Sequence, residues 1–198
     1  MILPISCIAY SEPPPNFGPI QNLLYTECLV CHSNDGNPEN PQFPRIAGQK
    51  ENYLVTELKA FRDHKRRDAD AFGYMYGPAS SLSNNQIHLL AEYFSEQPTA
   101  TNVDPGSPAD MKAGKEIFEN GIPSEGVPPC FACHGGDAQG TAMAPRLAGQ
   151  WSTYIVKQLN AFKNGYRHEA TMMPAVAQHL TAAQETDVAD YLQGLQKD

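Results

Sequence analysis

The chain has 198 residues, of which 41% are hydrophobic, and 22 Asp and Glu against 14 Lys and Arg give a formal net charge of −8. Its apolar runs are only a few residues long, too short to span a bilayer as a helix. The negative charge disfavours binding to nucleic acid and to anionic lipid. The length suits one large domain or two domains of about 100 residues each.

The N-terminal segment, residues 1–16, is predicted to lie outside the folded domains. Its first ten residues are apolar, but they lack a basic stretch and are too few for a complete export signal. We interpret residues 1–16 as the remnant of a signal or an N-terminal extension. Cys7 in this segment could carry a lipid and attach the protein to a membrane surface, although Pro4 stands where such signals usually have Leu.

Helical patterns follow from residue 17 onward. A first helix is predicted over 19–32, and a second contains apolar residues spaced i, i+4, i+7 at Leu54, Leu58 and Phe61. A last helix is predicted to begin at the capping box Ser83–Gln86. No stretch alternates with period two, so the fold class is expected to be all-α with almost no sheet.

Two segments between these elements are predicted to be irregular. The basic run 64–67 is interpreted as a solvated loop in preference to a docking patch. Residues 98–108 are rich in Pro, Gly and small polar residues, which is typical of a linker. We therefore place domain 1 at 17–97 and domain 2 at 109–198, with the first helix of domain 2 over 109–120.

The second half of the chain repeats the first. Residues 44–49 and 145–150 share the pattern P-R-[IL]-A-G-Q at an offset of 101 residues, and the match continues into the following helix. Two CxxCH motifs match at an offset of 102, and the last helices match at an offset of 98, with a second capping box at 181–184. A period of about 100 residues indicates a duplicated domain and is too long for a solenoid repeat.

Each repeat carries one CxxCH motif, the signature of covalent c-type haem attachment. The two motifs comprise Cys28, Cys31 and His32 in the first repeat, and Cys130, Cys133 and His134 in the second. Two thiols three positions apart can reach the two vinyl groups of a porphyrin, and the adjacent His can ligate the iron. A structural zinc site would need four ligands, and a redox CxxC would need a βαβ context. Two in-register motifs in helical repeats favour two haems.

A methionine at matched positions is the candidate for the second axial ligand. Met75 lies seven residues before Leu82, and Met173 lies seven residues before Leu180, so the repeat makes them equivalent. Met172 and Met143 are competing candidates for the second haem. His/Met ligation raises the reduction potential of a haem relative to stronger nitrogen donors.

The other four histidines have no histidine partner in the opposite repeat and are predicted to lie at the surface. They are His64, His88, His168 and His179. Of these, His168 is a minor alternative ligand because it lies shortly before Met172.

The repeated order of CxxCH, P-R-[IL]-A-G-Q, a Met loop and a short final helix resembles the dihaem cytochrome c4 family over roughly residues 17–197. The resemblance implies two class I cytochrome c folds related by a pseudo-twofold axis, with His/Met ligation at both haems. It also implies a periplasmic location and electron delivery toward a terminal oxidase. The expected partners are a bc-type or a small copper or haem donor and a haem–copper oxidase as acceptor.

The resemblance assigns further roles in each haem pocket. Pro44 and Pro145 match the proline whose carbonyl accepts a hydrogen bond from the axial histidine. Two pairs of repeat-related residues are candidates for binding haem propionates: Arg45 and Arg146, with surface pairing as the alternative, and Tyr53 and Tyr154, with core packing as the alternative.

The predicted function is outer-sphere electron transfer, because carboxylates and histidines are too scattered to form an acid–base site. One alternative is an enzyme such as a dihaem thiosulfate dehydrogenase or a peroxidase, which would need an unusual ligand or an open iron. Another is an electron-transfer subunit of a dehydrogenase complex.

Overall fold

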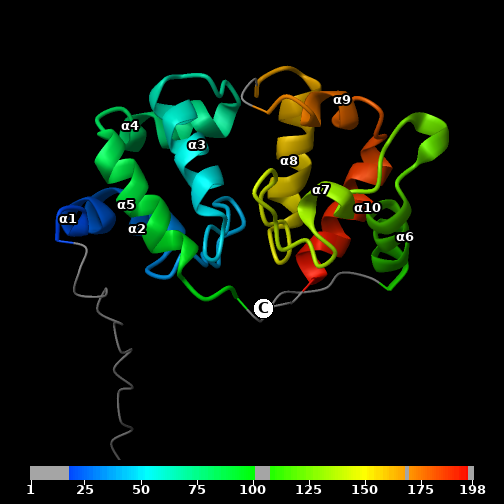
Figure 1. Ribbon diagram of the computed structural model, residues 1–198, viewed down its shortest axis with the longest axis horizontal. Coiled ribbons are helices and arrows are strands. Elements are labelled where there is room, and N and C mark those ends of the chain that lie inside the picture. The colour runs from blue at the N-terminus through cyan, green and yellow to red at the C-terminus, as the bar shows by residue number, and fades with distance from the viewer. Residues whose placement is uncertain (1–17, 101–107, 168–169, 196–198) are drawn as a thin grey trace, which may run out of the picture.

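The protein is described by a computed structural model over residues 18–100, 108–167 and 170–195. Figure 1 shows two helical bodies side by side, the first carrying α1–α5 and the second α6–α10. Within the described ranges there is no strand, only the isolated bridges between 66 and 167 and between 122 and 127. The all-α, two-domain prediction is confirmed. Residues 1–16, with Cys7, and most of the linker lie outside the described residues.

Domain 1 begins with one continuous helical segment close to the predicted range 19–32. This segment is made of α1 (Gln21–Leu23), a π-helical turn η1 (Leu24–Cys28) and α2 (Leu29–His32). The remaining elements of the domain are α3 (Glu51–Arg62), a second π-helical turn η2 (Ala71–Met75), α4 (Tyr76–Ala79) and α5 (Asn84–Ser95). Single π-turns are rare and occur frequently at functional sites.

Domain 2 has the same order of helices but a different start. Its elements are α6 (Pro108–Asn120), a 3₁₀ turn η3 (Pro123–Glu125), α7 (Phe131–His134), α8 (Ser152–Lys163), α9 (Met173–Ala177) and α10 (Ala182–Gly194). A loop separates α6 from the CxxCH helix α7, whereas the two are continuous in domain 1. Helix α6 begins at Pro108, the last residue of the predicted linker.

Both predicted capping boxes are present. The Ser83 hydroxyl accepts from the Gln86 N–H at 3.3 Å, and the Gln86 side chain accepts from the Ser83 N–H at 2.9 Å. Thr181 and Gln184 repeat the arrangement at 3.3 and 2.7 Å. These reciprocal bonds satisfy backbone donors that a helix start leaves without partners, so they fix the residue at which α5 and α10 begin.

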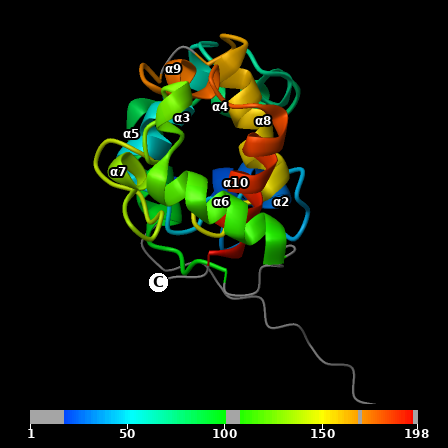
Figure 2. The same ribbon diagram turned by 90° about the vertical axis from the view of Figure 1, so that its right-hand side faces the viewer.

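Each domain has its own apolar core, and in domain 2 the core depends on a close crossing of α6 with α10. Figure 2 shows α6 lying across α10. At the crossing, a Cβ added to Gly114 would lie 2.0 Å from the Asp187 carbonyl oxygen and 2.6 Å from the Cβ of Tyr191. Only glycine allows this approach of the two backbones.

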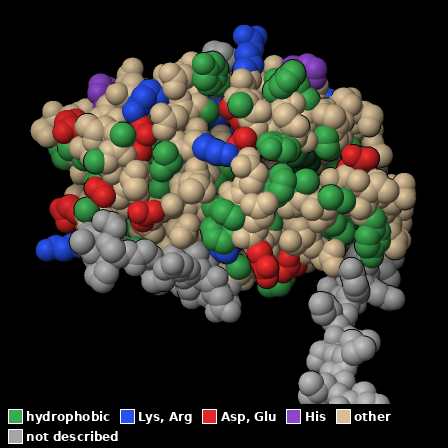
Figure 3. All heavy atoms as spheres, turned by 180° about the vertical axis from the view of Figure 1, so that it is seen from behind, with side chains coloured by type: hydrophobic (Ala, Val, Ile, Leu, Met, Phe, Trp, Pro, Cys, Tyr) green, Lys and Arg blue, Asp and Glu red, His purple; other side chains and the backbone are tan. Residues whose placement is uncertain are grey.

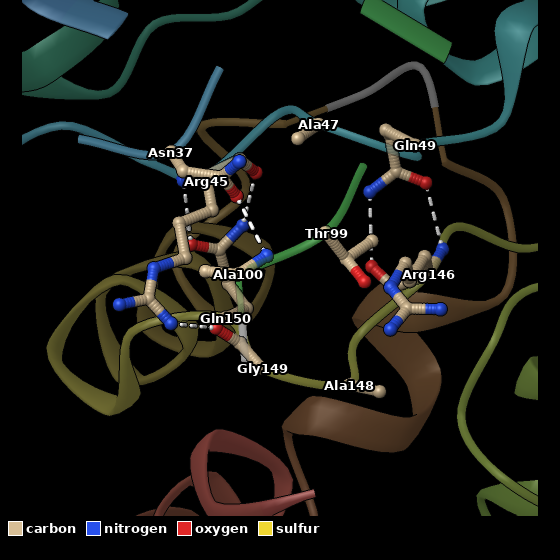
Figure 4. Close-up of a pocket in the computed structure, with 10 residues that line it drawn as sticks. All are labelled: Asn37, Arg45, Ala47, Gln49, Thr99, Ala100, Arg146, Ala148, Gly149 and Gln150. Atoms are coloured by element: carbon tan, nitrogen blue, oxygen red, sulfur yellow. Dashed lines mark hydrogen bonds between the residues drawn. The ribbon is translucent and has the colours of Figure 1, made fainter. Parts of the chain in front are cut away.

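The two domains meet through α3 and α8, which face each other in Figure 1, and through the loops that precede them. The Gln150 side chain accepts from the Arg45 N–H at 2.9 Å and donates to the Arg45 carbonyl at 2.7 Å. Gln49 makes the same two bonds with Arg146, at 2.7 and 2.9 Å (Figure 4). We call Gln49 and Gln150 the amide clamp. The two equivalent pairs of hydrogen bonds show that a pseudo-twofold axis relates the domains at this contact.

The linker closes one side of the same boundary. The Asn37 side chain donates to the Pro98 carbonyl at 2.8 Å and accepts from the Ala100 N–H at 3.0 Å. Thr99 and Ala100 line a small cleft together with the amide clamp and its partners Arg45 and Arg146 (Figure 4). The described part of the linker is therefore hydrogen-bonded to domain 1.

Replacing Gln150 with Ala is expected to lower the free energy of unfolding by about 2–4 kcal/mol, since two partly buried backbone groups of Arg45 lose their partners. Denaturant unfolding of the haem-loaded protein measures this loss. Gln21→Ala, at an exposed position of α1, is the control and should change the free energy by only a few tenths of a kcal/mol. Equal effects of the two substitutions would contradict a stabilising role for the amide clamp.

Candidate haem sites

The CxxCH residues of domain 1 lie on one helical turn and line one cavity. Cys28 ends η1, and Cys31 and His32 lie in α2. The cavity contains about 1190 Å³ of empty space, part of it open to solvent, and Met75 lines it together with both thiols and His32. Its walls are mostly apolar, built from α3, α5 and the segment around Met75. Space, apolar lining and the donor set all fit a haem.

The axial histidine of each CxxCH motif is buried and oriented by a backbone carbonyl. The His32 Nδ1 lies 3.1 Å from the Pro44 oxygen, and the His134 Nδ1 lies 2.9 Å from the Pro145 oxygen. Burial lowers the pKa of both imidazoles, and the hydrogen bond to the carbonyl opposes this shift. A neutral ring that donates through Nδ1 presents Nε2 as the metal-binding nitrogen.

The first cysteine of each motif is a buried thiol. Burial raises the pKa of Cys28 to about 12, helped by Glu27 and Cys31, and burial raises the pKa of Cys130 to about 11. The described ranges contain no group of three or more His, Cys, Asp or Glu side chains placed to hold a metal ion. Each CxxCH motif offers two thiols and one histidine, one ligand fewer than the four of a structural zinc site.

The candidate methionines differ in where they lie. Met75 ends η2, packs against the domain 1 core and lines the cavity. Met173 begins α9 and packs against the domain 2 core. By contrast, Met172 is 66% exposed and Met143 is 85% exposed. Packing thus favours Met173 over its two competitors, while His168 lies outside the described residues.

The arginines that follow the motif prolines of the repeat lie at the domain boundary. The Arg45 guanidinium lies 3.8 Å above the Trp151 ring and donates to the Gly149 carbonyl at 2.8 Å. Arg45 does not line the domain 1 cavity, and both Arg45 and Arg146 line the cleft of the amide clamp. The Arg45 side chain therefore reaches across the boundary, and the propionate role of Arg45 and Arg146 stays a prediction.

Tyr53 and Tyr154 come together at the same boundary, and both line the domain 1 cavity. Burial, reinforced by the nearby Glu57 carboxylate, raises the pKa of Tyr53, so its hydroxyl stays protonated and able to donate. Tyr154 belongs to domain 2, so the haem pocket of domain 1 is completed by the other domain. The repeat identified both tyrosines but not their shared location.

The basic run 64–67 differs from the prediction at one residue. His64, Lys65 and Arg67 are exposed, as expected of a solvated loop. Arg66 is instead 2% exposed, and its guanidinium lies between Glu57 and Asp68. The solvated interpretation is wrong for Arg66, because its partners include a side chain from the other domain and cannot be found by local pattern.

The described histidines outside the CxxCH motifs are at the surface. His88 and His179 are exposed, and exposed His64 stacks on Tyr76 with ring centroids 4.1 Å apart. None of the three lines the domain 1 cavity. The prediction of surface histidines is confirmed for these three.

Comparisons with known proteins agree with this architecture. A family model for cytochrome c matches twice, at residues 20–97 and 111–196. Cytochrome c-552 of Acidithiobacillus ferridurans is 42% identical over 171 residues, covering 86% of this chain and 74% of the relative. Cytochrome c4 of Pseudomonas aeruginosa is 34% identical, covering 85% and 83%. The solved cytochrome c4 of Acidithiobacillus ferrooxidans superposes with a TM-score of 0.79 at 42% identity, covering 85% and 98%.

A relative with a more specific name is also similar. The thiosulfate dehydrogenase electron acceptor of Thiomonas intermedia is 35% identical over 171 residues, covering 83% of this chain and 76% of the relative. Two family matches, two CxxCH motifs and two related helical domains lead to one conclusion: the chain belongs to the cytochrome c family, as a dihaem member of the cytochrome c4 type with two covalently bound haems.

Proposed function

We propose that this protein carries electrons between respiratory partners in the periplasm, by outer-sphere transfer at two haems with His/Met ligation. One observation supports this most strongly. Met75 and His32 line the same cavity, so both side chains are available to ligate an iron bound there, and such a haem would have no open position for a substrate. An enzymatic function would need such a position or an unusual ligand.

The chain's own residues hold and shield the cofactor. Cys28, Cys31, Cys130 and Cys133 would form the thioether links, with His32 and Met75 as axial ligands in domain 1 and His134 and Met173 in domain 2. When bound, haem supplies a one-electron couple whose potential depends on its ligands and surroundings. The carbonyls of Pro44 and Pro145 orient the imidazoles of His32 and His134. The proposed domain limits are residues 17–97 and 109–198.

The surface available to partners in domain 1 is partly apolar. Figure 3 shows apolar side chains gathered around a hollow on the half of the molecule that carries domain 1. Among the exposed large apolar residues, Val30 lies within the CxxCH motif, and Phe72 and Tyr74 lie in η2 beside Met75. A small apolar contact ringed by polar groups suits brief encounters with redox partners.

The proposed donor is a bc-type complex or a small copper or haem protein, and the proposed acceptor is a haem–copper oxidase. A negative chain disfavours nucleic acid as a partner. The described residues include no helix that is both long and apolar enough to cross a membrane. Peripheral membrane association through Cys7 remains a separate proposal.

A second candidate function is to accept electrons from a thiosulfate-oxidising enzyme, and the name of the Thiomonas intermedia relative favours it. One pair of experiments separates the two. The reduced protein is mixed with membranes containing a haem–copper oxidase, and the oxidised protein is mixed with a thiosulfate dehydrogenase plus thiosulfate. Rapid oxidation by the membranes supports the respiratory role, and rapid reduction only in the second mixture supports the alternative. Reduction by thiosulfate without added enzyme would contradict both and indicate an enzyme.

A further inference from the structure

A buried charged cluster lies where the pseudo-twofold axis passes between the domains. Arg66 and Arg167 are both 2% exposed, and their backbones are joined by the isolated bridge between residues 66 and 167. Glu57 accepts from Arg66 at 2.6 Å and from Arg167. Gln158 accepts from Arg66 at 2.8 Å and from Arg167 at 3.0 Å. Two arginines from two domains thus share two acceptors.

The members of this cluster are related by the sequence repeat at an offset of 101 residues. Arg66 corresponds to Arg167, and Asp68, which pairs with Arg66 at 3.0 Å, corresponds in sequence to Glu169. Glu57 corresponds to Gln158. The arginines and the acidic residues after them are therefore matched in charge between the two domains. The pair Glu57 and Gln158 is the one unmatched position in this set.

The unmatched charge lies on the side of domain 1. Glu57 lines the cavity that contains Cys28, His32 and Met75, whereas Gln158 does not line it. A buried carboxylate near a haem stabilises the ferric form, which carries one more positive charge, and so lowers the reduction potential. Charges in a poorly solvated interior are weakly screened. The shift in reduction potential therefore depends on the distance between the carboxylate and the iron, and only weakly on the salt concentration.

Two other carboxylates line the same cavity but are less effective. Glu27 is exposed, and Asp70 pairs with Lys157 at 2.8 Å in a partly exposed ion pair. Water and salt screen both charges. Glu57 is 6% exposed, so water and salt screen it least among the acidic side chains of this cavity wall. Its ion pairs with Arg66, which lines the same cavity, and with Arg167 offset part of its field, but the two arginines are matched between the domains and the charge of Glu57 is not.

We propose that Glu57 sets the difference in potential between the two haems, making the domain 1 haem the lower-potential member and thereby directing electrons from domain 1 to domain 2. Glu57 acts as a tuning residue through its field and does not touch the reacting iron. The inference rests on the proposed function only in assuming that both haems are His/Met ligated and exchange electrons.

The test is a redox titration of the haem-loaded full chain in which each haem is followed separately. Haem resonances in the proton NMR spectrum are assigned to domain 1 through contacts with Phe43, which lines its cavity. Glu57→Gln is expected to raise the domain 1 potential and to lower the equilibrium constant for electron transfer from domain 1 to domain 2 by about tenfold. The double substitution E57Q/Q158E, which exchanges the charge between the domains, is expected to reverse the order of the potentials.

Asp68→Asn is the matched control, because it removes a charge that also pairs with Arg66 but does not line the cavity. It should change the separation of the two potentials much less than Glu57→Gln does. The single substitution Gln158→Glu keeps Glu57 and its ion pairs and should narrow the separation by lowering the domain 2 potential. It therefore tests the inference even if Glu57→Gln disturbs the boundary.

The outcomes are distinct. The inference is supported if the difference between the two reduction potentials becomes smaller in Glu57→Gln and in Gln158→Glu, at both low and high salt. Two normal His/Met couples whose separation is unchanged in all variants, or changes equally in Asp68→Asn, would overturn it while leaving the proposed electron-carrier function intact. Failure to observe two His/Met couples in the unmodified protein would instead overturn the proposed ligation.

Discussion

Met173→Ala is expected to remove the sulfur ligand of the domain 2 haem. The iron should then become five-coordinate or bind water, and the potential of that haem should fall by about 0.1 V or more, a modest part of the ~0.8 V range that axial ligands span. The long-wavelength charge-transfer band of ferric haem with Met ligation should lose about half its intensity, because the domain 1 haem keeps Met75. Visible absorption and redox titration measure both effects.

Met172→Ala is the matched control for this substitution. Met172 precedes Met173 in the chain but is 66% exposed, so its loss should leave the spectrum and both potentials unchanged. If Met172→Ala removed half the band and Met173→Ala did not, Met172 would be the ligand and the assignment from packing would be wrong. Met75→Ala should produce the corresponding loss at the domain 1 haem.

Gly114→Ala is expected to lower the free energy of unfolding of domain 2 by about 3 kcal/mol or more. A methyl group at this position would lie 2.0 Å from the Asp187 carbonyl oxygen, so α6 and α10 would have to separate. Denaturant unfolding, followed by far-ultraviolet circular dichroism and by haem absorption, measures the loss.

Gly136→Ala provides the comparison. A Cβ at Gly136 would meet nothing within 4 Å, and the residue is exposed. Its substitution should change the free energy of unfolding by less than about 0.5 kcal/mol or stabilise slightly. If Gly114→Ala changed the free energy of unfolding as little as Gly136→Ala, the α6–α10 crossing would tolerate a methyl group and its close approach would not be important for stability.

Much of the architecture was predictable because it is encoded locally. The capping boxes at Ser83 and Thr181 fix where α5 and α10 begin, and the i, i+4, i+7 spacing identifies α3 and α8. The haem attachment residues were predictable for a similar reason, since a CxxCH motif needs only one helical turn. Matched spacing to the last helix likewise selected Met75 and Met173 as candidate ligands, and their role as ligands stays a prediction.

The contacts between the domains were not predictable from such patterns. Arg66 lies in a basic run that is typical of a surface loop, yet it is buried because Glu57 and Gln158 lie within hydrogen-bonding distance. Arg45 follows a motif proline, and nothing in that motif indicates that its guanidinium stacks on Trp151 of the other domain. The repeat could have suggested a boundary here, since both arginines recur at the same offset. It could not say which side chains face across it.

The reciprocal bonds of the amide clamp have a consequence for how the chain can change. In a homodimer, every substitution near the twofold axis occurs twice, so a new carboxylate would face a copy of itself across the axis. Two copies joined in one polypeptide are free of that restriction: Gln49 and Gln150 can keep the symmetric contact while Glu57 and Gln158 diverge. Joining the two copies in one chain thus allows the domains to keep a symmetric interface while the charges beside their haems differ.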